Sequence, residues 1–315
     1  MRLLVSMGVR PQGRVGEPLR PLLCEVDADR GCVLRRQPIE VVQHGHDGID
    51  QELTSACRGP DGQLWQAAHT EVLRIDPQTL DVTARWSHPS FHNVHSVIAA
   101  PDQDLVVTAT STDRVLKLDA TGRLIHTWSL APRELPRGDL RGLDHNAFKP
   151  HRCHPNHAEF VGDTLWVTRF ATRDCRSLPG DRIIALPEAM PHDGRLRGGW
   201  LWFTQVTGRV VAVDPHTLAR KVDLDLQALT GESRMLGWCR GIDVVGDRVF
   251  VGFSMLRRPR HREVLRLLWR GLRGHKLPTR VLELDWRAQR VVRETVLGNA
   301  AGGTIYAVTA YPDNA

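Results

Sequence analysis

Hydrophobic and polar residues alternate along short segments of this chain, and the segments recur. One plan is shared by 63–77 (QLWQAAHTEVLRIDP), 104–119 (DLVVTATSTDRVLKLD) and 200–215 (WLWFTQVTGRVVAVDP). Each has a short apolar segment, a polar break, and a second alternating segment that ends in Asp. A period of two, as in VLRID, predicts half-buried β-strands. The Asp, Pro and Gly residues between the segments predict turns.

The spacing of these strands predicts a β-propeller. Strands follow one another every ~8–12 residues with almost no helical pattern, which is typical of sandwiches, barrels and propellers. Because the repeating unit has four strands, we expect an all-β, six-bladed β-propeller forming one domain over 1–315. Five blades are predicted at 51–89, 92–130, 154–187, 192–226 and 237–297. The last strand, TIYAVTAYP, then joins the N-terminal strands RLLVSMG and LLCEVDA, which leaves no open sheet edge.

Two segments interrupt the repeat: a Pro- and Arg-containing connection at 131–152 and an insert at 256–278 within the sixth blade. The insert predicts an amphipathic helix with arginines on one stripe and leucines on the other. Its 257–276 portion carries a charge of +7 against +6 for the whole chain, so the propeller itself is nearly neutral. This weakens a nucleic-acid interpretation. It leaves the helix as a lid on the channel, or as a contact to an anionic membrane surface or a protein partner.

Several phrases carry a family resemblance. The repeated blade phrases resemble the NHL-repeat and SMP-30/gluconolactonase-like group of six-bladed propellers over nearly the whole chain. The phrases HPNHAEF (154–160), LWVTRF (165–170), HDG (192–194) and LGWCRGI (236–242) are similar to those of a poorly characterised bacterial propeller family. The resemblance implies a shared site without naming a reaction. SMP-30 proteins bind metal through acidic and amide ligands, whereas the matching positions here hold histidine.

Three histidines occupy similar places in successive repeats. His95, His157 and His192 each precede an apolar strand, at what the repeat predicts to be the start of an innermost strand. Such starts cluster at one mouth of the channel, so the three imidazoles are predicted to converge. Imidazole is a common ligand of divalent transition metals, and three protein ligands with open positions are typical of catalytic sites. We therefore expect Fe, Zn or Mn here. The alternative is a set of channel histidines hydrogen-bonded to carbonyl groups and water.

Other residues near these positions suggest supporting roles. Arg240 is predicted to bind an anionic substrate group, and Cys239 to act as a softer fourth ligand. Asp174 is predicted to orient a ligand histidine. Further substrate-binding candidates are His92, His154 and Arg173.

These observations favour a metal-dependent hydrolase, lyase or isomerase acting on a small polar or anionic metabolite at the channel. The alternatives are a non-catalytic propeller that binds a ligand or protein, and a group transferase with a histidine nucleophile, because HNVHSVIAAPDQDLVV resembles arylsulfotransferase-like propellers. The six cysteines form no CxxC pair, and the chain shows no signal-peptide pattern or long apolar run. We therefore expect a cytoplasmic protein with reduced thiols.

Overall fold

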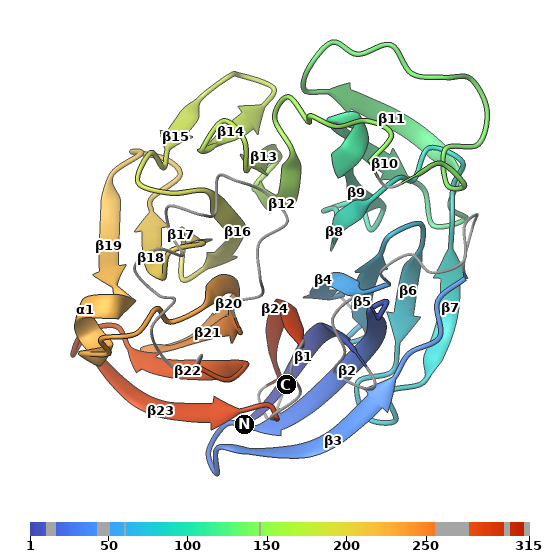
Figure 1. Cartoon of the computed structure of the whole chain (residues 1–315). Helices are drawn as coiled ribbons and strands as arrows, with labels where there is room; N and C mark the ends of the chain where they lie inside the picture. The colour runs from blue at the N-terminus through green and yellow to red at the C-terminus, as the bar shows by residue number, and fades with distance from the viewer. Residues whose placement is uncertain are drawn as a thin grey trace.

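The alternating segments form strands, and the strands form a ring of six four-stranded antiparallel sheets around a central channel (Figure 1). This computed structural model describes residues 1–10, 17–42, 51–59, 61–144, 146–255, 277–298 and 303–311. The predicted six-bladed β-propeller is confirmed, with blade limits close to those expected from the repeat.

Each blade has one inner strand beside the channel and one outer strand at the rim. Blade 2 contains β4 (Leu53–Arg58), β5 (Leu64–Ala68), β6 (Val72–Ile75) and β7 (Val82–Trp86). Blade 3 contains β8 (Val94–Ala99), β9 (Leu105–Ala109), β10 (Arg114–Leu118) and β11 (Leu124–Ser129). Blade 4 contains β12 (Pro155–Val161), β13 (Thr164–Arg169), β14 (Asp174–Leu178) and β15 (Ile183–Ala185). Blade 5 contains β16 (Pro191–Arg197), β17 (Trp200–Gln205), β18 (Arg209–Val213) and β19 (Arg220–Asp225). Blade 6 contains β20 (Trp238–Val245), β21 (Arg248–Ser254), β22 (Arg280–Asp285) and β23 (Arg290–Val296).

Blade 1 closes the ring with strands from both ends of the chain. Its inner strand, β24 (Thr304–Tyr311), pairs antiparallel with β1 (Arg2–Val9), which is followed by β2 (Arg20–Asp27) and β3 (Cys32–Pro38). The described ends of the chain therefore lie close together (Figure 1). The closure predicted from the terminal strands is confirmed, and it leaves the ring without an open edge.

The core is divided into six hydrophobic clusters, one between each pair of neighbouring blades. Trp166 of blade 4 packs with Phe203 of blade 5, for example, and Leu3 of blade 1 with Phe250 of blade 6. Outer strands such as β3 and β23 alternate between exposed and partly buried positions. The period of two in the sequence thus reflects strands that are covered on both faces near the channel and on one face at the rim.

One α-helix lies in the described residues: α1 (Leu226–Thr230). It begins after Asp225, whose carboxylate accepts hydrogen bonds from the backbone N–H groups of Gln227 and Ala228. The helix predicted in the insert falls on 256–276, outside the described residues. Among the described residues no helix is long and apolar enough to cross a membrane.

A candidate site at the upper mouth of the channel

The inner strands start at one end of the channel, which we call the upper mouth, and finish at the other, the lower end. All six of these strands carry a β-bulge or similar irregularity near the start, where their pairing with the next strand shifts register. In blade 3 the pairing moves from Val94↔Ala109 to Ser96↔Thr108. The skipped residues are Thr54, His95, Asn156, Gly194 and Tyr306, and in β20 the irregularity lies between Cys239 and Ile242. A bulge re-aims a side chain, so each blade can present a different group at the same place.

This register corrects the predicted histidine set. The residue equivalent to His95 is Asn156, whereas His157 pairs with Thr168 as Ser96 pairs with Thr108. Along a strand, a shift of one residue moves a side chain to the opposite face. His157 lines a cavity at the lower end, where its Nε2 atom lies 4.0 Å from Glu159 Oε2. The three predicted imidazoles therefore do not converge on one point.

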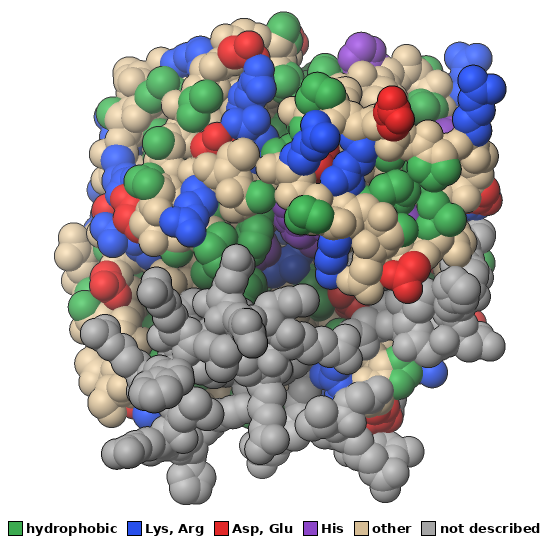
Figure 2. Space-filling view, turned by 45° about the horizontal axis from the view of Figure 1, so that its top comes forward, with side chains coloured by type: hydrophobic (Ala, Val, Ile, Leu, Met, Phe, Trp, Pro, Cys, Tyr) green, Lys and Arg blue, Asp and Glu red, His purple; other side chains and the backbone are tan. Residues whose placement is uncertain are grey.

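A different group of imidazoles forms at the upper mouth, which we call the imidazole cluster: His95, His151, His154 and His192. The ring centroid of His154 lies 5.1 Å from that of His95 and 4.8 Å from that of His151. Phe170 continues the contact, 5.0 Å from His154 and 5.1 Å from His192. Figure 2 shows histidine and Lys or Arg side chains at the bottom of the hollow in the middle of this face.

Burial keeps these histidines neutral at pH 7. It lowers the pKa values of His95 and His192 well below the usual 6.5, and the charge of Arg240 adds to the effect. Burial also lowers the pKa of His154 to about 3 and that of His151 to about 4. A neutral imidazole has one donor and one acceptor nitrogen. Its hydrogen bonds therefore determine which nitrogen faces a ligand as a base and which as a donor.

The hydrogen bonds of His192 and His95 differ in this respect. Asn156 Nδ2 donates to the Pro191 carbonyl oxygen and to His192 Nδ1, both at 2.9 Å. Because His192 Nδ1 accepts, the proton of this ring is on Nε2. His95 Nε2 lies 3.1 Å from Asn93 Oδ1 and donates to it, which leaves its Nδ1 as the acceptor. His192 Nε2 and His95 Nδ1 are both buried, with no hydrogen-bond partner in the described part of the chain.

Arg240 lies beside these rings on β20. It is 8% exposed, and its guanidinium carbon lies 4.3 Å from the centroid of the Tyr306 ring. The Tyr306 hydroxyl donates to Glu52 Oε1 at 2.7 Å. Burial lowers the pKa of Arg240, and the charges of Asp193 and Glu52 partly oppose this. Among the described residues the guanidinium makes no ion pair with a carboxylate, so the upper mouth contains a buried cation in contact with an aromatic ring.

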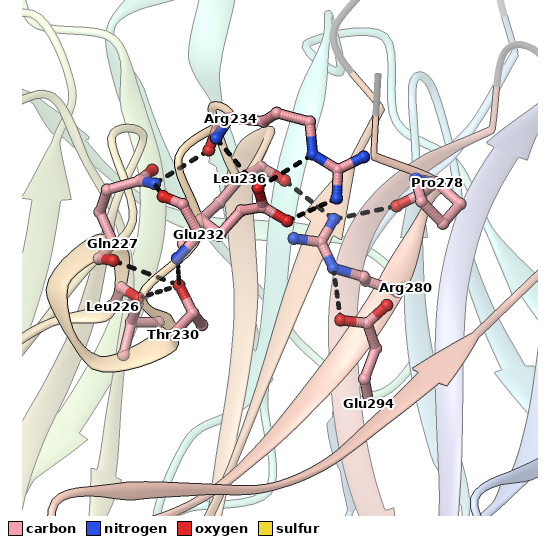
Figure 3. A network of polar contacts seen from close by, with 9 residues as sticks. All are labelled: Leu226, Gln227, Thr230, Glu232, Arg234, Leu236, Pro278, Arg280 and Glu294. Carbon is pink, nitrogen blue, oxygen red and sulfur yellow. Dashed lines mark hydrogen bonds and ion pairs between the residues drawn. The ribbon is translucent and has the colours of Figure 1, made fainter. Parts of the chain in front are cut away.

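Arg280, also buried in blade 6, shows how the same side chain is satisfied elsewhere (Figure 3). It is 1% exposed, and its Nη1 donates to the carbonyl oxygens of Leu236 and Pro278 at 2.9 and 3.0 Å. Its Nε lies 3.2 Å from Glu294 Oε2. Arg280 therefore joins three chain segments. Arg240 has no comparable set of partners in the described residues.

The other predicted site residues take structural positions. Cys239 is fully buried in the cluster between blades 5 and 6, and burial raises its pKa well above the usual value. The pairing of β20 with β21 is irregular between Cys239 and Ile242, so Arg240 lies in a bulge while Cys239 packs in the core. Asp174 forms a two-point pair with Arg169, with distances of 2.8 and 2.6 Å, and so does not orient a histidine. Arg173 is exposed and donates to the Pro187 carbonyl oxygen.

His92 anchors the 131–152 connection instead of reaching a ligand position at the channel. Its Nε2 lies 3.3 Å from the Leu143 carbonyl oxygen, and its ring meets Phe148 edge-on at 5.0 Å.

The predicted metal ligands do not fit a transition metal in this arrangement. The described residues contain no group of three or more His, Cys, Asp or Glu side chains placed to hold a metal ion. His154 Nδ1 and His151 Nδ1 contact each other at 2.6 Å, and His192 Nδ1 is occupied by Asn156.

Sequence analysis missed the residues that complete the mouth. Asn93 and Asn156 fix the two tautomers, Phe170 and Trp238 pack against His192, and Tyr306 packs against Arg240. The aromatic residues resemble ordinary core residues in the sequence. The positions of Asn156 and Tyr306 could have been found by aligning the residue that follows the start of each inner strand.

Comparisons with known proteins support the fold. No family model matches the chain, and no curated protein matches it in sequence. A protein of unknown function from Bacteroides caccae is similar with a TM-score of 0.63 and 13% identity, covering 98% of this chain and 97% of its own. A nidogen/laminin complex structure gives 0.60 and 9%, with the same coverage. A streptogramin B lyase structure gives 0.53 and 12%, covering 95% and 89%. These likenesses show the propeller fold alone, and the finer resemblance to NHL and SMP-30 propellers stays a prediction.

Proposed function

We propose that the protein is an enzyme that binds a small anionic molecule at the upper mouth and moves a proton on it with neutral histidines. The observation that carries this proposal is the buried Arg240 guanidinium, which contacts no carboxylate in the described residues. A buried charge costs several kcal/mol unless it is paired. A carboxylate or phosphate on a ligand would supply the pair, and the fork of N–H donors suits a two-oxygen anion.

The two neutral histidines supply complementary chemistry. His95 offers a lone pair on Nδ1, which suits a general base, and His192 offers an N–H on Nε2, which suits an oxygen that gains negative charge. General acid–base catalysis of this kind contributes ~10²–10⁴-fold in rate. Lyases and isomerases use it to take a proton from carbon beside a carboxylate or carbonyl group. A hydrolase would use the same base on water.

The similar structures do not choose between catalysis and binding. One is a lyase and another belongs to a complex of two proteins, so this fold is compatible with either function. The choice of an enzyme rests on the imidazole cluster, because a site that only binds an anion has no need of an unpartnered base beside the cation.

Proton exchange with solvent tests the proposal without knowledge of the full reaction. The protein is incubated in D₂O with a panel of small hydroxy-, keto- and amino-carboxylic acids, and loss of the C–H signals is followed by NMR. We expect exchange on at least one acid with wild type and its loss in His95→Gln and His192→Gln. His126→Gln, on the exposed face of β11, is the matched control that keeps exchange.

Binding distinguishes the outcomes. One outcome is an acid that binds wild type but not Arg240→Gln, and whose C–H groups show no exchange with D₂O. That result would identify a propeller that binds anions without catalysis. Binding that is unchanged in Arg240→Gln would overturn the proposed anion site.

A further inference from the structure

The central channel is interrupted by one side chain. Arg195 is 2% exposed, and its Nη2 donates to the Ala56 carbonyl oxygen at 2.5 Å. Arg195 belongs to β16 and Ala56 to β4, and these strands face each other across the ring (Figure 1). The Arg195 side chain therefore spans the channel and separates the upper mouth from the lower end.

A cavity of about 600 Å³ lies at the lower end. This volume falls in the range of small-molecule sites, roughly 300–1,000 Å³. Each of the six inner strands contributes to its wall near the point where the strand ends. One lining residue from each strand is Arg58, Ala99, Glu159, Arg197, Asp243 and Thr309.

One ion pair in this cavity connects neighbouring blades. Arg197 Nε donates to Asp243 Oδ1 at 2.7 Å, and the second oxygen of Asp243 accepts from the backbone N–H of Ala310 at 2.8 Å. This pair ties the ends of β16, β20 and β24 together. It offers little to a ligand.

The remaining charged groups are incompletely paired. Arg195 Nε and His157 Nε2 are buried without a hydrogen-bond partner in the described residues, and both side chains line the cavity. Arg58 lies over the Tyr311 ring at 5.5 Å and makes no ion pair within the described ranges. Glu159 accepts a long hydrogen bond of 3.3 Å from the Leu196 N–H and pairs with no Arg or Lys there. Two cations and one carboxylate thus line a single cavity without contacting each other.

We propose that this cavity is a second ligand site, which binds a small hydroxy- or amino-carboxylic acid. The carboxylate of the ligand lies on Arg195 and Arg58, and its hydroxyl or amino group donates to Glu159. Such a molecule provides at once the anion that the two arginines lack and the donor that Glu159 lacks. Since Arg240 is not among the residues that line this cavity, the site is distinct from the one at the upper mouth.

Three probes that share one dicarboxylate skeleton test this assignment. L-Malate carries a hydroxyl group, L-aspartate an amino group, and succinate neither. In calorimetric titrations of the full chain, we expect malate and aspartate to bind at least ~10-fold more tightly than succinate, the value of one charge-assisted hydrogen bond. Glu159→Gln should reduce this preference. Arg58→Gln, an exposed position, should weaken all binding by ~10-fold.

Two further arginine variants locate the binding. Arg30→Gln changes a side chain that is 80% exposed on the β2–β3 turn and should leave the affinities unchanged. Arg240→Gln removes the proposed anion site at the upper mouth, and in this variant the lower cavity should still bind malate and aspartate more tightly than succinate. Absence of binding by all three probes would overturn the proposal, as would affinities that Arg58→Gln leaves unaltered or that Arg240→Gln abolishes. Equal affinities for malate, aspartate and succinate would overturn the role of Glu159. Arg195→Gln is an additional variant that should also weaken binding. If Arg195→Gln fails to fold, the Arg58→Gln and Glu159→Gln variants still test the proposed site.

Discussion

The upper mouth and the lower end of the channel are built from the same six strands, but they handle charge differently. At the upper mouth, one buried arginine faces an aromatic ring and neutral imidazoles. At the lower end, Arg197 is paired with Asp243, and that carboxylate is also bound by backbone N–H groups. Strand starts therefore carry neutral imidazoles beside an arginine that is unpaired within the described residues, whereas strand ends carry, beside the proposed second ligand site, an ion pair that holds the blades together.

Strand geometry explains part of this difference. Bulges near the strand starts free side chains such as His95 and Tyr306 from the regular alternation. At the strand ends the pairing is regular in most blades. A carboxylate such as Asp243 can therefore accept a hydrogen bond from the backbone of a neighbouring strand. Substitutions that affect one end of the channel and spare the other therefore test this difference.

The largest expected effect is on catalysis. His95→Gln removes the proposed base while retaining a side chain that can donate to Asn93. We expect the rate of substrate proton exchange to fall by ~10²–10⁴-fold. Circular dichroism should show a folded protein, and malate binding at the lower end should persist. A variant with full activity would remove His95 from the mechanism.

The next effect is on stability. Asp243→Asn leaves Arg197 without its charged partner and weakens the hydrogen bond from Ala310, so the free energy of unfolding should fall by about 2–3 kcal/mol. Urea denaturation measures this change. Asp223→Asn, which weakens the exposed pairs with Arg209 and Arg220, is the control and should cost about 0–1 kcal/mol. Equal losses of unfolding free energy in the two variants would show that the Arg197–Asp243 pair stabilises the protein no more than an exposed ion pair does.

A smaller and graded effect is expected from acid. Burial lowers the pKa of His154 to about 3 and that of His151 to about 4, below the 6.5 of an unfolded histidine. The unfolded chain therefore binds more protons below about pH 6.5, and stability falls as the pH decreases toward about 4. Each such histidine contributes at most about 1.4 kcal/mol per pH unit.

His154→Asn tests this dependence. Position 154 has a φ of 55°, and its counterpart in blade 3 is Asn93 with a φ of 53°, so asparagine suits the backbone. The variant should show a flatter fall in unfolding free energy between pH 6.5 and 4 than wild type. An unchanged slope would mean that His154 does not carry the acid sensitivity of the upper mouth.

The sequence predicted the two ends unequally well. Period-two segments determine the strands, so the blades and the terminal closure were found. Arg240, His95 and His192 lie near the starts of their strands, at the upper mouth, and their predicted roles stay predictions. His157 was misplaced because a bulge is invisible in the hydrophobic pattern and shifts the facing of every side chain after it. The lower cavity was missed because its parts, such as Arg195 and Glu159, come from strands far apart in sequence.

The smallest expected effect concerns metal. The upper mouth was predicted to bind Fe, Zn or Mn through His95, His157 and His192, but His157 lies at the lower end. Catalysis by neutral imidazoles beside Arg240 needs no such ion. We therefore expect treatment with a chelator to leave proton exchange unchanged, and elemental analysis of untagged protein to show no metal that disappears in His95→Gln. Loss of activity on chelation, restored by one of the three metals, would instead require a ligand set beyond these histidines and would reverse the chemical contrast between the two ends.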